Sequence, residues 1–372
     1  MLRMKIGIDT FGCDHARSGF GSYLNSCIAN IPTDLLDNFE LFGSELDRYT
    51  YSSDRPIKFN SVSVLDSLVI ERFWHLFKIN KFLKKNKYDL VIYPAVERVI
   101  PIRFKTKGVA IVNSIISKQM ESSSGIYKWQ FKRGLKKISK IIAASNVIKE
   151  DLIKFGISAE KITVVHNGIE HKLFYPMVDL NEDEIQIHPF AIKRPYFIYG
   201  SNINGPEKKH EELIKAFELF KKRTGLPHRL VITGSEGNYF NYISDLAFNS
   251  EYSTDIFITG YFPHENLGKL YAGAEACIFP AVNEGVGLPI LEAMASGIPV
   301  LCSNSGALQE MGGDSPIYFD SNNIEEIATA MQLVVEDEEK RKSMIEKGLE
   351  RASNFSWDKT VLETLKSIGV DL

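Results

Sequence analysis

The sequence alternates short apolar runs with segments of helical period, and it does so in two separate blocks. The apolar runs are residues 4–9, 89–94, 108–113, 140–145 and 162–168, and then 195–201, 228–235, 255–261, 276–281 and 299–304. The helical segments are residues 68–86, 126–138 and 146–156, and then 210–224, 265–274, 288–296, 324–336 and 338–353. This alternation predicts parallel strands with crossover helices, and hence an α/β chain of two doubly wound, Rossmann-like domains.

The stretch YPMVDLNEDEIQIHPFAIKRP (175–195) interrupts the alternation with prolines and an acidic cluster, as a loop between domains does. At 372 residues the chain is also longer than one core usually grows. We predict an N-terminal domain over 1–175, a linker over 176–194 and a second domain over 195–354. A C-terminal helix within 355–372 is expected to pack back on the first domain. Ligands are expected at the carboxyl ends of the strands, in a central cleft that both domains face.

Basic residues far outnumber acidic ones between positions 72 and 140, although the whole chain carries a net charge of -3. Solvated helix faces would explain this equally well. The functional interpretation is docking to an anionic inner membrane surface, with Trp129, Phe131 and Leu135 interleaved with lysines on an interfacial helix. No nucleic-acid recognition motif accompanies the charge, so a nucleic-acid partner is not expected.

The sequence also bounds the compartment and the metal chemistry. No run approaches the roughly 20 apolar residues of a membrane span, and the N-terminus lacks a signal-peptide pattern. A cytoplasmic protein, peripheral on the membrane if the basic region docks there, is therefore expected. The four cysteines show neither zinc-ligand nor disulfide-framework spacing and are expected to be small buried side chains.

The most specific motif is NEGVGLPILEAMASGIPVL (283–301), in which a Gly-x-Gly-x-Pro turn opens a short helix. A helix N-terminus carries a partial positive charge, so Gly285–Leu288 suits a diphosphate. Glu284 before the turn and Glu292 within the helix can accept hydrogen bonds from hydroxyls on either side. Either glutamate alone would be a solvated helix residue. Together with the turn they indicate a diphosphate flanked by two polyols, which is a nucleotide sugar.

This segment, continued to residue 320, resembles the glutamate-x7-glutamate region of the retaining family 4 glycosyltransferases, which have the GT-B fold. It is most similar to their mannosyltransferase-type bacterial members. Three further segments are similar to other parts of the family. VVHNGIEHKLFYP (164–176) is similar to the family's domain junction, and GPEKKHEELIKAF (205–217) to its lysine-containing donor loop. SGFGSYLNSCI (18–28) is similar to its N-terminal glycine loop.

The resemblance implies roles for the donor-side residues. Glu284 would hold sugar hydroxyls near the reacting carbon, Glu292 would bind the ribose, and Lys208 would neutralise the departing diphosphate. The backbone of the turn would contact the sugar and phosphate, through Gly285, Val286, Gly287 and Leu288.

Other implied contacts compete with structural roles. Gly19 and Gly21 would let the N-terminal loop approach the donor or acceptor, but they could equally form a tight turn. Tyr261 and Phe262 would lie near the base, although a place in the core would also explain them.

The sequence departs from the family at two positions. Asn113 stands where many members have an acceptor-side histidine, and asparagine can orient a hydroxyl but cannot titrate. The arginine that often accompanies the donor lysine is absent, so Lys209 would have to replace its charge. The implied mechanism tolerates the first change, because a departing phosphate oxygen can take the acceptor's proton. It retains configuration and needs no metal ion.

The expected donor is GDP-mannose, with a UDP-hexose next, and no cofactor is expected. The acceptor would be a glycan or a polyprenyl-diphosphate-linked saccharide in bacterial polysaccharide or lipopolysaccharide synthesis. Two alternatives stay open from the sequence: a catalytically silent GT-B protein that binds nucleotide sugars, and a GT-B epimerase.

Overall fold

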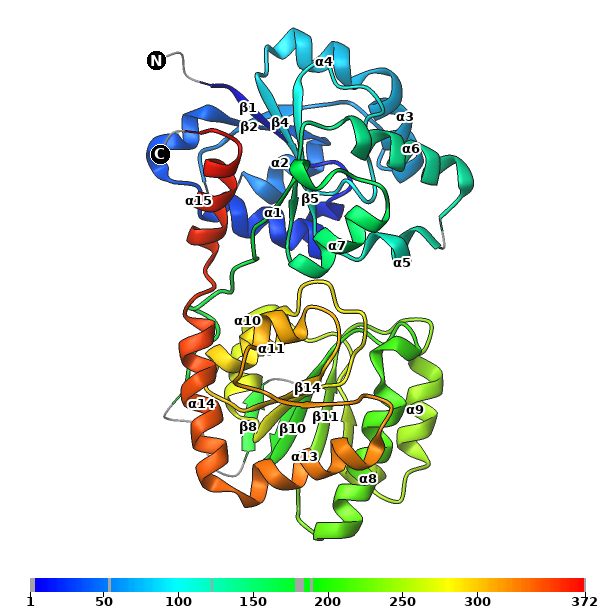
Figure 1. Ribbon diagram of the computed structural model, residues 1–372, viewed down its shortest axis with the longest axis vertical. Coiled ribbons are helices and arrows are strands. Elements are labelled where there is room, and N and C mark those ends of the chain that lie inside the picture. The colour runs from blue at the N-terminus through cyan, green and yellow to red at the C-terminus, as the bar shows by residue number, and fades with distance from the viewer. Residues whose placement is uncertain (1–3, 53–54, 122, 178–183, 188–189, 371–372) are drawn as a thin grey trace. The chain divides into compact units, whose positions relative to one another are not determined.

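Seven parallel strands form the sheet of the first of two units (Figure 1), in the order β3-β2-β1-β4-β5-β6-β7. The computed structural model describes residues 4–52, 55–121, 123–177, 184–187 and 190–370. The first unit runs to Gly168 and resumes at Trp357. Its strands are β1 (Ile6–Asp9), β2 (Phe39–Gly43), β3 (Lys58–Ser61), β4 (Leu90–Tyr93), β5 (Lys107–Val112), β6 (Lys140–Ala143) and β7 (Ile162–Val164).

Helices lie between most of these consecutive strands, although β4 and β5 are joined by a segment without a helix. They are α1 (Gly19–Ala29), α2 (Glu45–Tyr51), α3 (Leu68–Phe77), α4 (Ile79–Asn86), α5 (Ile116–Glu121), α6 (Gly125–Lys137), α7 (Asn146–Lys154) and the C-terminal α15 (Trp357–Ser367). The central strands β1 and β4 are buried along their whole length, because helices cover both faces of a parallel sheet. Val361 and Leu365 of α15 belong to the same hydrophobic cluster as Ile8 and Ile92 of the sheet.

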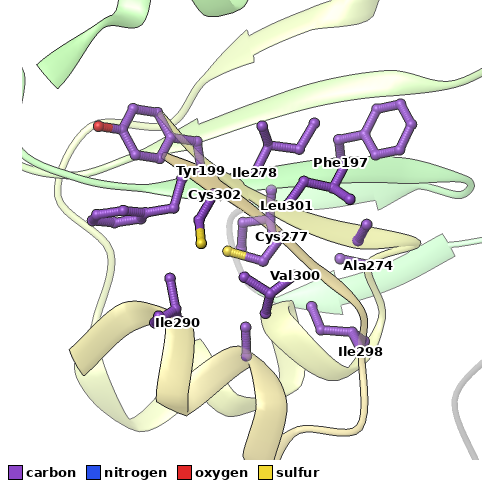
Figure 2. Close-up of a cluster of buried hydrophobic side chains, with 14 of the residues drawn as sticks. Phe197, Tyr199, Ala274, Cys277, Ile278, Ile290, Ile298, Val300, Leu301 and Cys302 are labelled. Carbon is purple, nitrogen blue, oxygen red and sulfur yellow. The ribbon is translucent and has the colours of Figure 1, made fainter. Parts of the chain in front are cut away.

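The second unit, Ile169–Ser356, contains a six-stranded parallel sheet in the order β12-β11-β10-β13-β14-β15. Its strands are β10 (Tyr196–Gly200), β11 (Arg229–Thr233), β12 (Ile256–Ile258), β13 (Ala276–Phe279), β14 (Val300–Ser303) and β15 (Ile317–Phe319). Its helices are α8 (His210–Thr224), α9 (Phe240–Phe248), α10 (His264–Ala272), α11 (Leu288–Ala295), α12 (Leu308–Gly312), α13 (Ile324–Glu336) and α14 (Glu338–Ala352). Figure 2 shows part of its core, where the sulfur atoms of Cys277 and Cys302 point toward the helix that carries Ile290.

The predicted fold class is confirmed, and both sheets reverse their strand order at one point. In the first unit the reversal lies between β1 and β4, and in the second between β10 and β13. At such a reversal, the loops that follow the two neighbouring strands run to opposite faces of the sheet. A crevice for a ligand therefore forms between them, at the carboxyl ends of the strands. The loops after β10 and β13 are those that carry Lys208 and Glu284.

Residues around the predicted linker differ from expectation. The second unit begins at Ile169, so 169–175 belongs to it and not to the N-terminal domain. The reason is packing: Phe174 is 1% exposed, and its ring lies 5.9 Å from that of Tyr271 in α10. Part of the expected linker forms an antiparallel hairpin, β8 (Glu184–Ile187) and β9 (Phe190–Lys193). Residues 178–183 and 188–189 lie outside the described part.

Two other expectations for the first unit are wrong. The single helix predicted over 68–86 is two helices, α3 and α4, separated at Lys78. Phe131 and Leu135 were expected on an interfacial helix surface, but both are fully buried because they form the core-facing side of α6. In the described residues no helix is long and apolar enough to cross a membrane.

Candidate functional site

The two predicted catalytic side chains of the second unit form an ion pair. Lys208 Nζ lies 3.1 Å from Glu284 Oε2, and each side chain is 21% exposed, so the pair is accessible to a ligand. Lys208 ends the short 3₁₀ turn Pro206–Lys208 after β10, and Glu284 lies between β13 and α11. The pair therefore bridges the two loops at the reversal point of the sheet.

The backbone of the lysine loop is anchored to the core. The hydroxyl of Tyr199 donates to the Lys208 carbonyl oxygen at 2.7 Å, and the Val282 amide donates to the Glu207 carbonyl oxygen at 2.9 Å. The Tyr199 ring packs between His210 and Phe279, with centroid distances of 4.8 and 5.3 Å. Burial lowers the pKa of His210 to about 4, so this imidazole is neutral at pH 7 and adds no positive charge. Lys208 therefore supplies the positive charge beside Glu284.

Gly306, which the sequence interpretation missed, fixes the backbone of the glutamate loop. Its φ is +63°, and a Cβ atom there would lie 2.6 Å from the carbonyl oxygen of Glu284 and 2.9 Å from its nitrogen. The next amide, that of Ala307, donates to the Glu284 carbonyl oxygen at 2.9 Å. Only glycine allows this approach without displacing Glu284. Residues 303–307 thus position Glu284, although they are distant from it in sequence.

Glu292 lies in the second turn of α11 in a largely enclosed position. Burial raises the pKa of its carboxyl to about 7, and the nearby Glu170 carboxylate adds to the shift. Among the described residues none donates a hydrogen bond to this side chain. A half-buried carboxyl without donors is stabilised by any ligand that brings hydroxyl groups, which is the role predicted for Glu292.

The neighbouring donor-site candidates are placed less favourably. The ammonium group of Lys209 donates to Glu212 at 2.6 Å and to Asn322 at 2.8 Å, so its charge is already neutralised. Tyr261 is 72% exposed and is free to contact a base, whereas Phe262 is 5% exposed within the hydrophobic core. Packing in the hydrophobic core, and not contact with a base, therefore explains Phe262.

In the first unit, Gly19 and Gly21 belong to the first turn of α1 and not to a loop. A Cβ atom at Gly21 would lie 2.4 Å from Ala16 Cα and from the Cys13 carbonyl oxygen, so glycine is required there for close packing. At Gly19 a Cβ atom would meet nothing within 4 Å. Gly19 consequently leaves open space at the helix N-terminus, while Gly21 has a structural function.

Asn113 follows β5, and its backbone amide contacts the buried carboxyl of Glu97, a residue that was not predicted from the sequence. Glu97 Oε1 accepts hydrogen bonds from the amides of Asn113 and Ser114, both at 3.2 Å. Asn113 Oδ1 accepts one from Asn167 at 3.4 Å. Glu97 Oε2 and Asn113 Nδ2 are buried and have no hydrogen-bonding partner in the described structure. The signal in the sequence was a lone glutamate in the apolar run PAVERVIPI.

Because Glu97 is buried, the stability of the protein should depend on pH. Burial raises the pKa of this carboxyl from 4.5 to about 8, so the folded state binds more protons than the unfolded state between these values. The free energy of unfolding contributed by Glu97 therefore falls as pH rises from about 4.5 to about 8. Glu97→Gln has no carboxyl to ionise and so removes this loss. We expect the free energy of unfolding of the variant, relative to that of the wild type, to rise by on the order of 3 kcal/mol between pH 5 and pH 8.5.

Urea unfolding at both pH values measures this gain. Glu160→Gln, at an exposed position of the same unit, is the matched control and should show no such growth. A pH-independent difference between Glu97→Gln and the wild type would contradict the assignment.

A second buried network supports the loop after β1. His75 Nε2 lies 2.6 Å from Asp9 Oδ2, and the Gly12 amide donates to Glu71 Oε2 at 3.1 Å. These contacts fix the carboxyl end of β1, which lies beside β4 at the strand-order reversal. The described residues include no cluster of three or more His, Cys, Asp or Glu side chains arranged to hold a metal ion.

Comparisons with known proteins match both parts of the chain. Residues 42–173 match the family described as Glycosyltransferase Family 4, and residues 181–351 match the one described as Glycosyl transferases group 1. The O-antigen chain mannosyltransferase B of Escherichia coli is 33% identical over 162 residues, covering 44% of this chain and 42% of the relative.

Two further similarities concern a lipid-linked acceptor and the fold. The Escherichia coli UDP-Gal:alpha-D-GlcNAc-diphosphoundecaprenol alpha-1,3-galactosyltransferase is 25% identical over 245 residues, 62% of this chain and 61% of the relative. The chain thus spans less than two thirds of either relative. The crystal structure of Anabaena HepE with UDP and glucose aligns with a TM-score of 0.75 at 16% identity, covering 98% of this chain and 99% of HepE.

Proposed function

Because this chain belongs to the family 4 glycosyltransferases, we propose that it transfers a hexose from a nucleotide-diphosphate sugar to a glycan or lipid-linked saccharide acceptor. The observation that carries the proposal is the Lys208–Glu284 ion pair at the reversal point of the second sheet. A ligand with a diphosphate and sugar hydroxyls offers a partner to each member of this pair. The mannosyltransferase relative favours mannose, and GDP-mannose, as the donor.

The pair suggests how donor binding prepares the reaction. In the structure the ammonium and carboxylate groups lie 3.1 Å apart and neutralise each other. When donor binds, Lys208 turns to the diphosphate and Glu284 to the sugar hydroxyls, so one internal contact is exchanged for two contacts with the ligand. The charge on the diphosphate grows as its bond to the sugar breaks, and Lys208 then contributes to the rate as well as to binding.

We propose retention of configuration through an oxocarbenium-like transition state. The bond from the anomeric carbon to the diphosphate oxygen breaks, and the acceptor oxygen bonds to the same face of the sugar. The departing phosphate oxygen takes the acceptor's proton, so Asn113 only has to orient a hydroxyl group. A side-chain amide can both donate to and accept from such a hydroxyl.

A lipid-linked acceptor in bacterial polysaccharide or lipopolysaccharide synthesis fits the galactosyltransferase relative, whose named acceptor is a diphosphoundecaprenol-linked sugar. We therefore propose a cytoplasmic protein that works at the inner membrane surface.

One observation favours a catalytically silent binding protein as the second candidate. Glu207 occupies the donor loop beside Lys208, where no arginine is present, and Lys209 is engaged by Glu212. A single available lysine gives a weaker electrostatic clamp on the diphosphate. Such a protein would bind the donor without transferring the sugar.

A donor panel tests the proposal in two steps. GDP, UDP, GDP-mannose and UDP-glucose are first compared for their effect on the melting temperature, because a ligand that binds only the folded state raises it. We expect GDP-mannose to give the largest shift and to be consumed when acceptor is added. A shift without turnover would favour the silent binding protein, and no shift with any of the four would contradict the proposed donor site.

A further inference from the structure

Helix α3 exposes an apolar stripe to solvent. Val69, Phe73 and Phe77 are four residues apart and are 58%, 57% and 72% exposed, so they lie on one face of the helix. The rings of Phe73 and Phe77 stack on each other with centroids 6.3 Å apart. The opposite face buries Glu71 and His75, both in the network around Asp9. Polar contacts therefore fix the orientation of α3, and its apolar side is left uncovered.

Helix α6 lies beside α3 (Figure 1). It adds a second exposed apolar pair, because Ile126 and Trp129 are 81% and 56% exposed. The Arg72 guanidinium of α3 lies 3.6 Å from the ring centroid of Tyr127 in α6, so the two helices are in direct contact. We call the exposed residues of both helices the α3–α6 surface: Val69, Ile70, Phe73, Phe77, Ile126 and Trp129. Exposed apolar residues gathered on two helices in contact are typical of an interaction site.

The charged side chains that α4 and α6 carry are all positive. The only carboxylate within α3, α4 and α6 is that of Glu71, which is buried. Two exposed carboxylates precede these helices: Asp66, just before α3, lies 3.3 Å from His15, and Glu121 lies before α6. The lysines and arginine on α4, on α6 and at the helix ends are Lys78, Lys81, Lys84, Lys85, Lys87, Lys128, Lys132, Arg133, Lys136 and Lys137.

We infer that the α3–α6 surface docks the protein on an anionic phospholipid bilayer. Phenylalanine and tryptophan side chains enter the boundary between headgroups and acyl chains, while surrounding lysines are attracted to the anionic headgroups. A second copy of the chain would bring the same positive charge, and charge repulsion would oppose association. The inference deepens the proposed function, because a lipid-linked acceptor lies in that same bilayer, but the surface is separate from the Lys208–Glu284 pair.

Sedimentation with vesicles tests the inference on the full chain. We expect binding to vesicles of phosphatidylglycerol and phosphatidylcholine at low salt, weaker binding at high salt, and little binding to phosphatidylcholine alone. The double variant Phe73→Ser/Phe77→Ser should bind at least about tenfold more weakly, because two apolar groups are lost. Lys84→Glu/Lys85→Glu should lose about tenfold or more at low salt.

Matched controls separate docking from general effects. Phe248 is 80% exposed on α9 of the second unit, and Phe248→Ser should bind vesicles like the wild type. The melting temperature and its shift with GDP report the fold and the donor site of each variant. Folded protein that ignores anionic vesicles while still responding to GDP would overturn the docking inference alone. Light scattering that shows a dimer dissociated by Phe73→Ser/Phe77→Ser would also overturn it, since a second copy would then cover the surface.

Discussion

Replacing Glu284 by alanine is expected to reduce kcat/KM for sugar transfer by at least about a thousandfold, because it removes a contact to the sugar near the reacting carbon. The change also leaves Lys208 without its partner at 3.1 Å. Nucleotide binding should survive, since Glu284 is proposed to hold the sugar and not the nucleoside. Initial rates with GDP-mannose, together with the GDP-induced shift in melting temperature, measure the two effects separately.

Two further variants sharpen this result. Glu284→Gln keeps a hydrogen-bond acceptor but loses the charge that pairs with Lys208, so we expect activity between that of the wild type and Glu284→Ala. Glu265→Ala removes an exposed glutamate of α10 in the same unit and should leave the rate unchanged. Wild-type rates in Glu284→Ala would refute the assignment of the catalytic pair.

Replacing Lys208 by alanine is expected to lower kcat by about a hundredfold or more, since the charge of the leaving diphosphate would develop without a cation beside it. Substrate binding should weaken less than kcat falls, because the interaction strengthens in the transition state. Steady-state kinetics with varied donor concentration separates kcat from KM.

Lys215 provides the control for Lys208. It is an exposed lysine of α8 paired with Glu211 at 2.6 Å, and Lys215→Ala should change neither parameter. Lys208→Arg keeps the charge but alters its geometry, so we expect partial rescue of kcat. If Lys208→Ala raised KM while kcat stayed constant, the lysine would serve binding alone.

The central strands of both sheets were predictable because strands buried on both faces are continuous apolar runs. Strand β3, with the sequence KFNS, was missed because it is short, partly exposed and polar. The split between α3 and α4 was missed because the apolar period continues across Lys78, a turn residue that ends the first helix and precedes the second. Periodicity thus identified most of the buried strands, but it missed the buried strand β2 as well as the edge strand β3 and the helix boundary at Lys78.

The candidate site was predictable where a local motif marks it. Glu284 and Lys208 lie in recognisable segments, and the structure brings their side chains together. Gly306 carries no local signal, and the lone glutamate in PAVERVIPI does not reveal what Glu97 contacts, because both residues act through contacts with residues elsewhere in the sequence. Lys209 was expected to replace the missing arginine, and only the structure shows that Glu212 and Asn322 engage it.

The C-terminal helix α15 has a consequence for synthesis of the protein. Val361 and Leu365 complete the hydrophobic cluster of the first unit, and Trp357 packs on Tyr23 with ring centroids 5.5 Å apart. The second unit, by contrast, is contained between Ile169 and Ser356. The first unit is therefore completed only after the second unit has been synthesised, and until α15 follows, the nascent first unit keeps apolar surface open to chaperones.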